Sequence, residues 1–419
     1  MTLHAREINQ DVRELGALLG EVLEAQTSTE AFETVETIRN SCIDYRRGDA
    51  ETRDEVHRAL NRLNPETQDI VARAFTTYFE LINLAEERER VREIREGSQE
   101  GVLADSVEEA VRDLAERGAD PEEFEQVLED VLIQPTFTAH PTEARRKTVK
   151  AKLRSVARDI ERLDERRLTD REQKHIERNL DAEVTSLWQT PQVRDRRPEV
   201  TDEALNVQWY LENVLFDVID QVYDELEHTI EDVYDEDIDI DTLYEFRSWA
   251  GSDRDGNPFV TTEVTEETLE RQRETVLPLY RNKLKELSGV LSQDASNIAT
   301  DAVFNERLDR HKSRLPGIAT EAEERYPDEP YRQKLRLMRE SVIRVSDVRQ
   351  GGYENEEELL TDLRVIADSL RENDAEVIAE AHVDPLIRKV ETFGFTLASL
   401  DLRDHRKMHT DAIAEAVDR

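Results

Sequence analysis

The sequence has 419 residues and a formal net charge of −40, because 57 Lys and Arg stand against 97 Asp and Glu. So acidic a surface repels nucleic acid and anionic membranes, and both are therefore excluded as expected partners. Cys42 is the only cysteine, which excludes an intrachain disulfide and a cysteine cluster for zinc.

Two further features concern location and solvent. No apolar run approaches the roughly 20 residues that span a membrane, and the N-terminus, MTLHAREINQDVREL, has no signal-peptide pattern. We therefore expect a cytoplasmic globular protein. Only ten of the basic residues are lysines. Such an acidic, lysine-poor composition is typical of a protein from a salt-loving cell, where salt screens the repulsion.

Most of the chain is predicted to be helical. Apolar residues recur every three or four positions over 8–23 and 70–82, which is the period of a helix. Pro65 suits the first turn of the second helix, and Gly97 suits its end. Further helices are expected over 143–189, 201–236, 262–292, 330–346 and 356–372. The acidic stretch 231–245 is expected to be a solvated loop.

Three short apolar runs interrupt the helices, at 131–139, 246–251 and 395–403. Each is too short for a helix, and each leads into polar residues. Strands separated by long helical stretches indicate βα units of a parallel sheet or barrel. In a (β/α)₈ barrel the active groups lie just past the C-terminal ends of the strands, which is where the residues discussed next stand.

The first of these residues is His140, in the stretch FTAHPTEARRKT (137–148). Pro141 fixes the backbone at a first helical turn, and Glu143 lies in that turn, where a carboxylate is favourable. The cations at 145–147 follow, and some of them suit an anion site. The alternative is that His140 only caps the helix or fills a gap in the core.

The second stretch is SWAGSDRDGNPFVT (248–261), in which Asp-Gly-Asn-Pro predicts a tight turn. It offers Asp253 and Arg254 at the turn, and Trp249 either walls a pocket or packs in the core. An ordinary loop and a calcium loop are the alternatives. Calcium is disfavoured because Arg254 intrudes and the twelve-residue ligand spacing is missing.

The third stretch delivers Arg403 to the end of the last apolar run. Its planar fork of donors suits a carboxylate or a phosphate, and the alternative is an ion pair with one of the many acids. A further cluster, Arg194, Arg196 and Arg197, either contributes positive charge to such a site or forms a salt-bridged connection between helices.

Four stretches resemble the ordered signature stretches of the phosphoenolpyruvate carboxylase family. They are FTAHPTE (137–143), SWAGSDRDGNPFVT (248–261), EPYR (329–332), and FGFTLASLDLR (393–403) followed by HTDAIAEA (409–416). The region WQT…RRPEV (188–200) is also similar to the family. Ser252 stands where the family pattern has glycine. The similarity runs from about residue 130 to the last residue, and the first hundred residues fit only by their helical character.

The resemblance implies an enzyme that makes oxaloacetate and phosphate from phosphoenolpyruvate and bicarbonate, with a divalent metal such as Mg²⁺ and no biotin. It maps the family's essential histidine onto His140 and an arginine that contacts the substrate phosphate onto Arg403. Trp249, Asp253 and Arg254 fall in a stretch linked to the bicarbonate side of the pocket. The family is usually a homotetramer.

The resemblance also implies a mostly α fold, with a large helical elaboration around the first strands of a (β/α)₈ TIM-type barrel that is incomplete in this chain. An N-terminal helical region is expected at 1–130 and the first part of the barrel at 131–419. The family's metal-binding carboxylates, catalytic lysine and glycine-rich phosphate loop belong to its C-terminal half, so no metal ligand is assigned here. Gly351–Gly352 is the only glycine pair and lies in an acidic setting that is wrong for phosphate.

Three hypotheses remain open from the sequence. The chain is part of a carboxylase whose activity needs the missing half. Alternatively, it is a non-catalytic helical binding or assembly module that keeps the motifs by ancestry. The third hypothesis is a different enzyme on phosphorylated small acids that reuses the histidine site.

Overall fold

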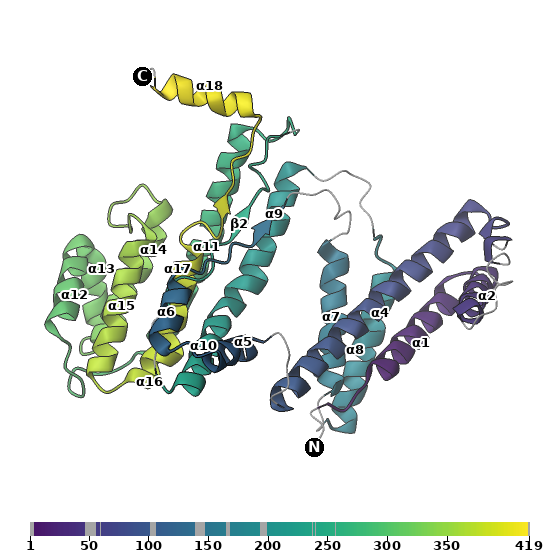
Figure 1. Cartoon of the computed structure of the whole chain (residues 1–419), viewed down its shortest axis with the longest axis horizontal. Helices are drawn as coiled ribbons and strands as arrows, with labels where there is room; N and C mark the ends of the chain where they lie inside the picture. The colour runs from purple at the N-terminus through teal and green to yellow at the C-terminus, as the bar shows by residue number, and fades with distance from the viewer. Residues whose placement is uncertain are drawn as a thin grey trace. The chain divides into compact units, whose positions relative to one another are not determined.

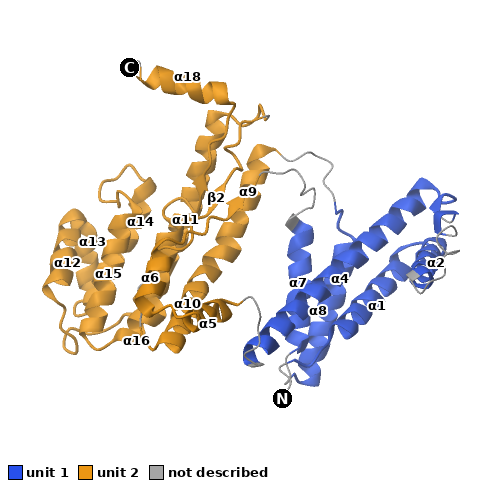
Figure 2. Ribbon diagram, viewed as in Figure 1, with its two compact units in different colours: residues 1–104, 143–197 blue, residues 105–142, 198–419 orange. Residues whose placement is uncertain are grey.

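The computed structural model describes residues 4–46, 56–58, 60–100, 106–138, 147–164, 168–192, 199–236, 238, 240–255 and 257–417. The chain divides into two compact units, formed by residues 1–104 with 143–197 and by residues 105–142 with 198–419 (Figure 2). The chain therefore enters each unit twice. The expected domain boundary near residue 130 stays a prediction. The division into two compact units does not test where the barrel begins along the chain.

The first unit is a bundle of helices (Figure 1). Its helices include α1 (Ile8–Gln26), α2 (Thr29–Arg46), α4 (Pro65–Glu100), α7 (Lys147–Asp164) and α8 (Asp170–Trp188). In α1 the predicted apolar stripe is buried, at Leu15, Leu19, Val22 and Leu23. These side chains join those of α4, α7 and α8 in one core. The two N-terminal helices predicted from periodicity are confirmed, although α4 continues through Gly97.

The prediction of a single helix over 143–189 is wrong, because α7 ends at Asp164 and α8 begins at Asp170. Thr169 caps α8: its hydroxyl oxygen accepts the N–H of Glu172, and its own N–H donates to the Glu172 carboxylate at 2.8 Å. The helical period continues on both sides of this break, so periodicity does not reveal it. The spacing Thr-x-x-Glu is the sequence signal that marks it.

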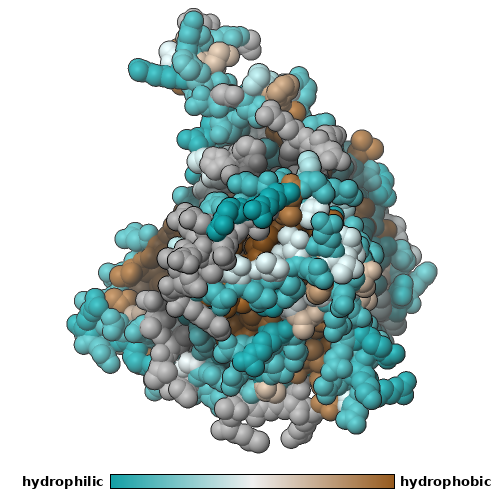
Figure 3. Space-filling view, turned by 90° about the vertical axis from the view of Figure 1, so that its right-hand side faces the viewer, coloured by the Kyte–Doolittle hydropathy of each residue, from teal (hydrophilic) through white to brown (hydrophobic). Residues whose placement is uncertain are grey.

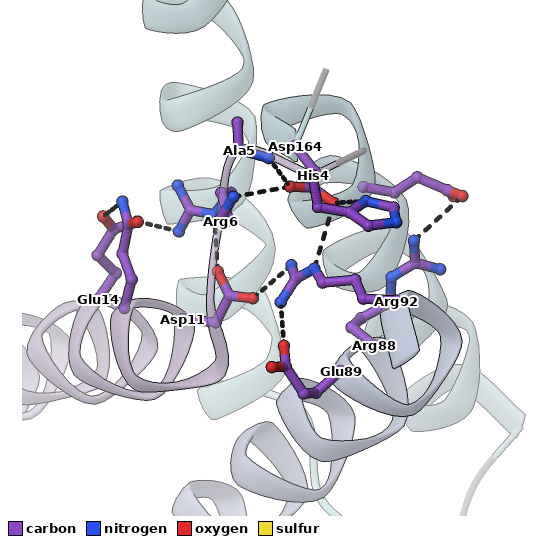
Figure 4. Close-up of polar contacts among 11 residues, drawn as sticks. His4, Ala5, Arg6, Asp11, Glu14, Arg88, Glu89, Arg92 and Asp164 are labelled. Carbon is purple, nitrogen blue, oxygen red and sulfur yellow. Dashed lines mark hydrogen bonds and ion pairs between the residues drawn. The ribbon is translucent and has the colours of Figure 1, made fainter. Parts of the chain in front are cut away.

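A buried ionic cluster fixes the N-terminal segment onto α4 and α7 (Figure 4). The backbone N–H groups of residues 5 and 6 donate to Asp164 Oδ1 at 2.9 Å, and His4 Nδ1 lies 2.7 Å from Asp164 Oδ2. Arg92 donates through Nε to Asp164 at 3.2 Å and through Nη2 to Asp11 at 2.7 Å. Burial raises the pKa of Asp164, but the contact with His4 and the other hydrogen bonds lower it more, so it lies below its ordinary value. The buried carboxylates are therefore paired charges, which is the condition for keeping them inside a bundle.

The second unit contains most of the helices and one small sheet (Figure 1). Its α-helices are α5 (Val107–Glu116), α6 (Pro121–Glu129), α9 (Val200–Tyr210), α10 (Phe216–Tyr234), α11 (Thr262–Val290), α12 (Ala302–Arg314), α13 (Pro316–Arg325), α14 (Pro330–Ile343), α15 (Glu356–Glu372), α16 (Glu376–Ile378), α17 (Asp384–Phe393) and α18 (Arg406–Val417). Short turns of other helix types lie at η1 (Leu211–Leu215), η2 (Arg344–Ser346) and η3 (Ala379–Val383).

The helices predicted for this unit agree closely with the structure. The ranges 262–292, 330–346 and 356–372 correspond to α11, to α14 with η2, and to α15. The range 201–236 is helical up to Tyr234, and the five π-helical residues of η1 join α9 to α10. The prediction that the chain is mostly α-helical is confirmed for the described residues.

The acidic stretch 231–245 departs from the expected solvated loop. Helix α10 continues to Tyr234 and ends at Asp235, whose φ of 55° is left-handed. Beyond it, Ile238, Ile240 and Leu243 are buried in the core, while Asp241 is exposed. The apolar residues, which alternate with acids in the sequence, therefore anchor this segment in the core. Their burial determines the position of the segment despite its negative charge.

The three short apolar runs form one parallel sheet in the order β1 (Thr136–Phe137), β2 (Arg247–Ser248) and β3 (Ser399–Leu400). Thr136 is paired with Arg247, and Arg247 with Ser399. A further bridge joins Ile133 to Tyr244 before the strands. The predicted parallel strands are confirmed, and long helical segments separate them along the chain.

The surface is largely hydrophilic on the face that Figure 3 shows. In the space-filling view of Figure 3, hydrophilic residues cover much of the coloured surface, and hydrophobic atoms show mainly in small areas between them. Among the described residues, no helix combines the length and apolar character that crossing a membrane requires.

Candidate anion-binding site at the strand ends

One face of the three-stranded sheet is polar and open to solvent. Side chains alternate across a strand, so Thr136, Arg247 and Ser399, which are paired in register, share one face. Thr136 and Ser399 are exposed. Trp249 and Asp401 lie two residues beyond their paired neighbours and continue this face toward the C-terminal ends of the strands. Parallel sheets are usually buried on both faces, so this exposed face is unusual.

Arg403 stacks on Trp249 on this face. The guanidinium carbon lies 3.9 Å from the centre of the indole ring. Stacking occupies the flat side of the guanidinium and leaves its in-plane N–H groups to bind an anion. Among the described residues, no ion pair joins Arg403 to an acid. We therefore find no ion pair between Arg403 and a carboxylate of the described residues, which was the alternative to anion binding.

Asp401 bonds to the indole instead of to Arg403. The Trp249 Nε1–H donates to Asp401 Oδ2 at 3.1 Å. The other carboxylate oxygen of Asp401 lies 3.4 Å from Nε of Arg247, which is also 3.5 Å from Oε1 of Glu245. Asp401, two residues before Arg403 on the same face, is therefore held by Trp249 and Arg247.

The predicted turn after β2 is built against the end of β3. Asp253 pairs with Arg403 in a parallel bridge, in which Arg254 N donates to Arg403 O at 2.7 Å. Ser252 is fully buried, and its hydroxyl donates to Asp401 O at 2.9 Å. Asp253 Oδ1 accepts the N–H of Asp255 at 3.2 Å, which stabilises the turn itself. The two strand ends are therefore tied together where Trp249, Asp253 and Arg403 stand.

Gly251 makes this turn possible. Its φ is +85°, and a Cβ added there would lie 2.3 Å from Thr268 Oγ1 on α11. Thr265, one turn earlier on α11, donates its hydroxyl to Gly251 O at 2.8 Å. Arg254 reaches the same threonine, with Nη2 3.3 Å from Thr265 Oγ1. The close approach of backbone to helix thus requires glycine, and it places Arg254 at the start of α11.

The structure brings four of the five predicted site residues into one region. Trp249, Asp253, Arg254 and Arg403 lie at the ends of β2 and β3. His140 and the cluster Arg194, Arg196 and Arg197 lie outside the described residues. The strand that precedes His140, β1, is hydrogen-bonded to β2, and Trp249 N donates to Phe137 O at 2.8 Å. The roles expected of the site residues stay predictions.

Two supporting residues were missed by sequence reasoning. Arg247 stands two positions before Trp249, so strand alternation was the available signal that the two share a face. Thr265 had no such signal, because its contact with Gly251 depends on how α11 packs against the turn.

A second polar cluster, buried in the helices, was also missed. Lys334 Nζ lies 2.8 Å from Asp362 Oδ1 and 3.2 Å from His311 Nδ1, and Lys334 is only 1% exposed. Tyr353 donates its hydroxyl to Asp362 at 2.9 Å. His311 Nε2 lies 2.8 Å from the hydroxyl of Ser341, which donates to Gly351 O at 2.9 Å. Nε2 of His311 therefore carries the proton, and Nδ1 accepts from the lysine.

This cluster is an internal tie between helices. It connects α12, α14 and α15 with the segment at 351–353. The carbonyl of Gly351 is occupied by Ser341, and the carbonyl of Gly352 by Arg314. The glycine pair, whose acidic setting does not suit phosphate, thus has a packing role in the structure.

The described residues do not fit a divalent metal. No group of three or more His, Cys, Asp or Glu side chains among them is arranged to hold a metal ion. The acids of the strand-end site are engaged otherwise, Asp401 with Trp249 and Asp253 with its own turn. No chemical step is therefore assigned to a metal held by these residues.

Comparison with known proteins gives a consistent family. The family model of phosphoenolpyruvate carboxylase matches residues 8–419. The chain is 35% identical over 414 residues to a phosphoenolpyruvate carboxylase of Xanthomonas euvesicatoria pv. vesicatoria, covering 98% of this chain and 46% of the relative. It is 34% identical over 433 residues to that of Roseiflexus castenholzii, covering 99% and 46%.

A phosphoenolpyruvate carboxylase of Paraburkholderia xenovorans is 35% identical over 439 residues, covering 98% of this chain and 43% of the relative. The chain thus spans somewhat less than half the length of the curated relatives it matches. The matched region includes both units and every strand of the sheet. The chain belongs to the phosphoenolpyruvate carboxylase family.

Proposed function

We propose that this chain is the N-terminal part of an enzyme that forms oxaloacetate and phosphate from phosphoenolpyruvate and bicarbonate. The observation that carries the proposal is the stacked Arg403, which presents unpaired N–H donors at the ends of parallel strands in a chain of −40 formal charge. Among the described residues Arg403 has no acid partner, and its stacked guanidinium therefore has N–H donors available for an anion.

The chemistry proposed for this site passes through two intermediates. An oxygen of bicarbonate attacks the phosphorus of phosphoenolpyruvate, and the bond from phosphorus to the enol oxygen breaks, which gives carboxyphosphate and the enolate of pyruvate. Carboxyphosphate loses its proton and splits into carbon dioxide and phosphate. The C3 carbon of the enolate then attacks carbon dioxide and forms oxaloacetate.

The chain's own residues have distinct roles in this scheme. Arg403 binds the phosphate oxygens, and its fixed plane orients them. Trp249, Asp253 and Arg254 form the bicarbonate side of the pocket. His140 takes the proton of carboxyphosphate, which is a general-base step. The family relationship and the common location of the four described residues support these assignments.

The exposed face of the sheet supports a (β/α)₈ barrel that closes with further strands. Thr136 and Ser399 are exposed on it, and parallel sheets normally have both faces covered. Helix α18 also has no buried residue, and Met408, Ile413 and Val417 are exposed on it. We propose that polypeptide corresponding to the unmatched part of the relatives covers both. The same polypeptide is proposed to supply the ligands of a Mg²⁺ ion, since the described residues do not.

The remaining expectations are part of the same proposal. The complete enzyme is a cytoplasmic homotetramer that supplies oxaloacetate to the tricarboxylic acid cycle. The cell is salt-adapted, which the acidic, lysine-poor composition supports.

The test joins this chain to the part of the Xanthomonas relative that it does not match. Oxaloacetate is followed by its reduction with malate dehydrogenase, with Mg²⁺ and bicarbonate present. We expect bicarbonate-dependent turnover from the joined protein. The 419-residue chain alone should stay far below the roughly 10 per second that is typical of enzymes. Arg403→Gln in the joined protein is the matched control.

Three outcomes would contradict the proposal. Robust carboxylation by the isolated chain would show that no other part is needed. A folded joined protein without carboxylation would favour the non-catalytic binding module, and phosphate release without oxaloacetate would favour a different enzyme on phosphorylated acids.

A further inference from the structure

The carboxylate of Asp401 stands where it could either neutralise Arg403 or hold another group. The two residues are two positions apart on one strand, so their side chains share a face. Asp401 nevertheless accepts a hydrogen bond from the Trp249 indole at 3.1 Å and faces Arg247 at 3.4 Å. Its two oxygens are therefore engaged by two side chains of the β2 segment, Trp249 and Arg247.

The backbone around Asp401 is fixed independently of its side chain. Asp401 N donates to Ser248 O at 3.0 Å, and its carbonyl accepts the buried Ser252 hydroxyl at 2.9 Å. The position of the carboxylate thus follows from strand pairing, and the Trp249 side chain adopts the orientation that lets its N–H reach this carboxylate. A Trp side chain has two rotatable bonds, so one hydrogen bond at Nε1 defines the plane of the ring.

The plane of the indole in turn determines where Arg403 lies. Its guanidinium carbon is 3.9 Å from the ring centre, a distance at which the two planar groups stack. Arg403 is exposed, and no other side-chain partner among the described residues holds it. The ring face is therefore the support that limits the orientations of this long side chain.

We propose that Asp401 is a positioning residue, which fixes the Trp249 indole so that Arg403 is held stacked, unpaired and ready for an anion. The hydrogen bond has two effects: it orients the indole, and it engages the Asp401 carboxylate, which shares a face with Arg403, so that this carboxylate does not neutralise the arginine. The inference rests on the proposed function only in naming the anion, which is the phosphate of phosphoenolpyruvate.

The first test needs no ligand. An arginine stacked on an indole has ring-current-shifted side-chain NMR signals, and the Nε–H signal of Arg403 is identified by its loss in Arg403→Gln. We expect Asp401→Ala to remove most of that shift and to increase solvent exchange at the indole N–H of Trp249. Asp401→Asn, whose amide oxygen still accepts the indole N–H, should retain most of both.

Trp249→Phe is the matched control, because it keeps an aromatic face and removes the N–H donor. Its effect should resemble that of Asp401→Ala, and combining the two changes should add little further. An unchanged Arg403 signal in Asp401→Ala would overturn the proposal. An equal loss of the Arg403 ring-current shift in Asp401→Asn and Asp401→Ala would also overturn the proposal. Such a result would mean that the charge of Asp401 matters and that its hydrogen bond to the indole does not.

The second test uses phosphoenolpyruvate itself, in the joined protein. We expect Asp401→Ala to raise the KM for phosphoenolpyruvate about ten-fold, the loss typical of one well-placed interaction, and Asp401→Asn to restore it. If Arg403→Gln leaves the KM unchanged, the proposed function fails at Arg403, while the NMR result still decides the role of Asp401. If Arg403→Gln raises the KM and Asp401→Ala does not, the positioning role is wrong and the proposed function stands.

Discussion

Arg403 stacks on Trp249 with its guanidinium carbon 3.9 Å from the ring centre, while Asp401, two residues before it on the same face, bonds to that same indole. The arrangement separates a cation from a carboxylate that would otherwise neutralise it. It also places the flat indole ring against one face of the guanidinium, which leaves the N–H donors at the edge of the guanidinium accessible. The anion site that we propose therefore needs three side chains from the ends of two strands.

The shape of the arginine matters in this arrangement, and not only its charge. Arg403→Lys keeps the positive charge but loses the planar fork and the stacking surface. We expect binding of phosphoenolpyruvate to weaken roughly ten- to a hundred-fold, which corresponds to losing about 1.5–3 kcal/mol of charge-assisted hydrogen bonding. Titration calorimetry on the joined protein measures this.

Arg406→Lys is the control, since Arg406 lies on α18, outside the strand-end site. It should bind as the unmodified protein does. Equal affinity of the Arg403→Lys variant would mean that a point charge suffices and that stacking on Trp249 has no role in binding.

The sequence predicted those parts of the fold that depend on local pattern. Apolar periodicity located α1, α4, α11, α14 and α15, and three short runs gave the strands of the parallel sheet. The break between α7 and α8 was missed, because a helical period continues across it. The burial of Ile238 and Ile240 was missed because the charge of their neighbours suggested solvent.

The candidate site was predicted residue by residue, but not its connections. Family motifs identified Trp249, Asp253, Arg254 and Arg403, and strand order explains why they meet. The bond from Trp249 to Asp401 depends on register between β2 and β3, which no local pattern specifies. The cluster around Lys334 depends on how three helices pack, and its residues look like ordinary surface charges in the sequence.

Gly251 offers a test of the turn that carries the site. Gly251→Ala places a Cβ at a φ of +85° and 2.3 Å from Thr268 Oγ1. We expect it to lower the free energy of unfolding by about 2 kcal/mol or more, from backbone strain and overpacking together. Urea unfolding followed by circular dichroism measures the loss.

Gly289→Ala is the matched control within α11, because, apart from its chain neighbours and the helix's own backbone, no atom of the described residues lies within 4 Å of the added Cβ. It should stabilise the protein by about 0.5–1 kcal/mol, since alanine favours a helix. Similar effects of the two substitutions would show that the turn tolerates a side chain and does not approach α11 as closely as described.

The buried histidine of the second unit makes stability depend on pH. Burial, and then the charge of Lys334, lower the pKa of His311 from 6.5 to about 3. In the unfolded chain the histidine binds a proton below pH 6.5, whereas in the folded chain it stays neutral down to about pH 3. The unfolded state therefore gains protons in this window, and the protein loses up to about 1.4 kcal/mol per pH unit as the pH falls.

We expect His311→Gln to reduce this slope between pH 6.5 and pH 4, because glutamine does not titrate and its amide still donates to Ser341. The measurement is the free energy of unfolding in urea at a series of pH values. His228→Gln is the control, since His228 is exposed and its pKa is raised, mainly by a hydrogen bond to the Asp224 carbonyl. It should not reduce the slope, and a slope unchanged in His311→Gln would mean that this histidine is not buried neutral.

The net charge of −40 predicts a response to salt. At 1 M salt the screening length is about 3 Å, so repulsion among surface acids is largely removed. We expect the melting midpoint to rise from dilute buffer to molar potassium chloride. Sucrose at matched osmolality is the control, because it is excluded from the protein surface but does not screen charges. A midpoint that stays flat or falls in potassium chloride would contradict a salt-adapted surface.

The last prediction concerns His140, which lies outside the described residues, and it separates a catalyst from a helix cap. His140→Asn in the joined protein keeps a similar size and one hydrogen bond, but asparagine does not exchange a proton near neutral pH. Losing a general base typically costs about 10²- to 10⁴-fold in rate, so we expect oxaloacetate formation to fall by that factor. The melting midpoint should be unchanged. Release of phosphate from phosphoenolpyruvate should persist in part, because phosphoryl transfer depends mainly on cations and positioning.

A capping histidine would behave differently, since asparagine is itself a favoured cap. Near-normal carboxylation by His140→Asn therefore identifies a cap, and lost carboxylation with an unchanged melting midpoint identifies the base.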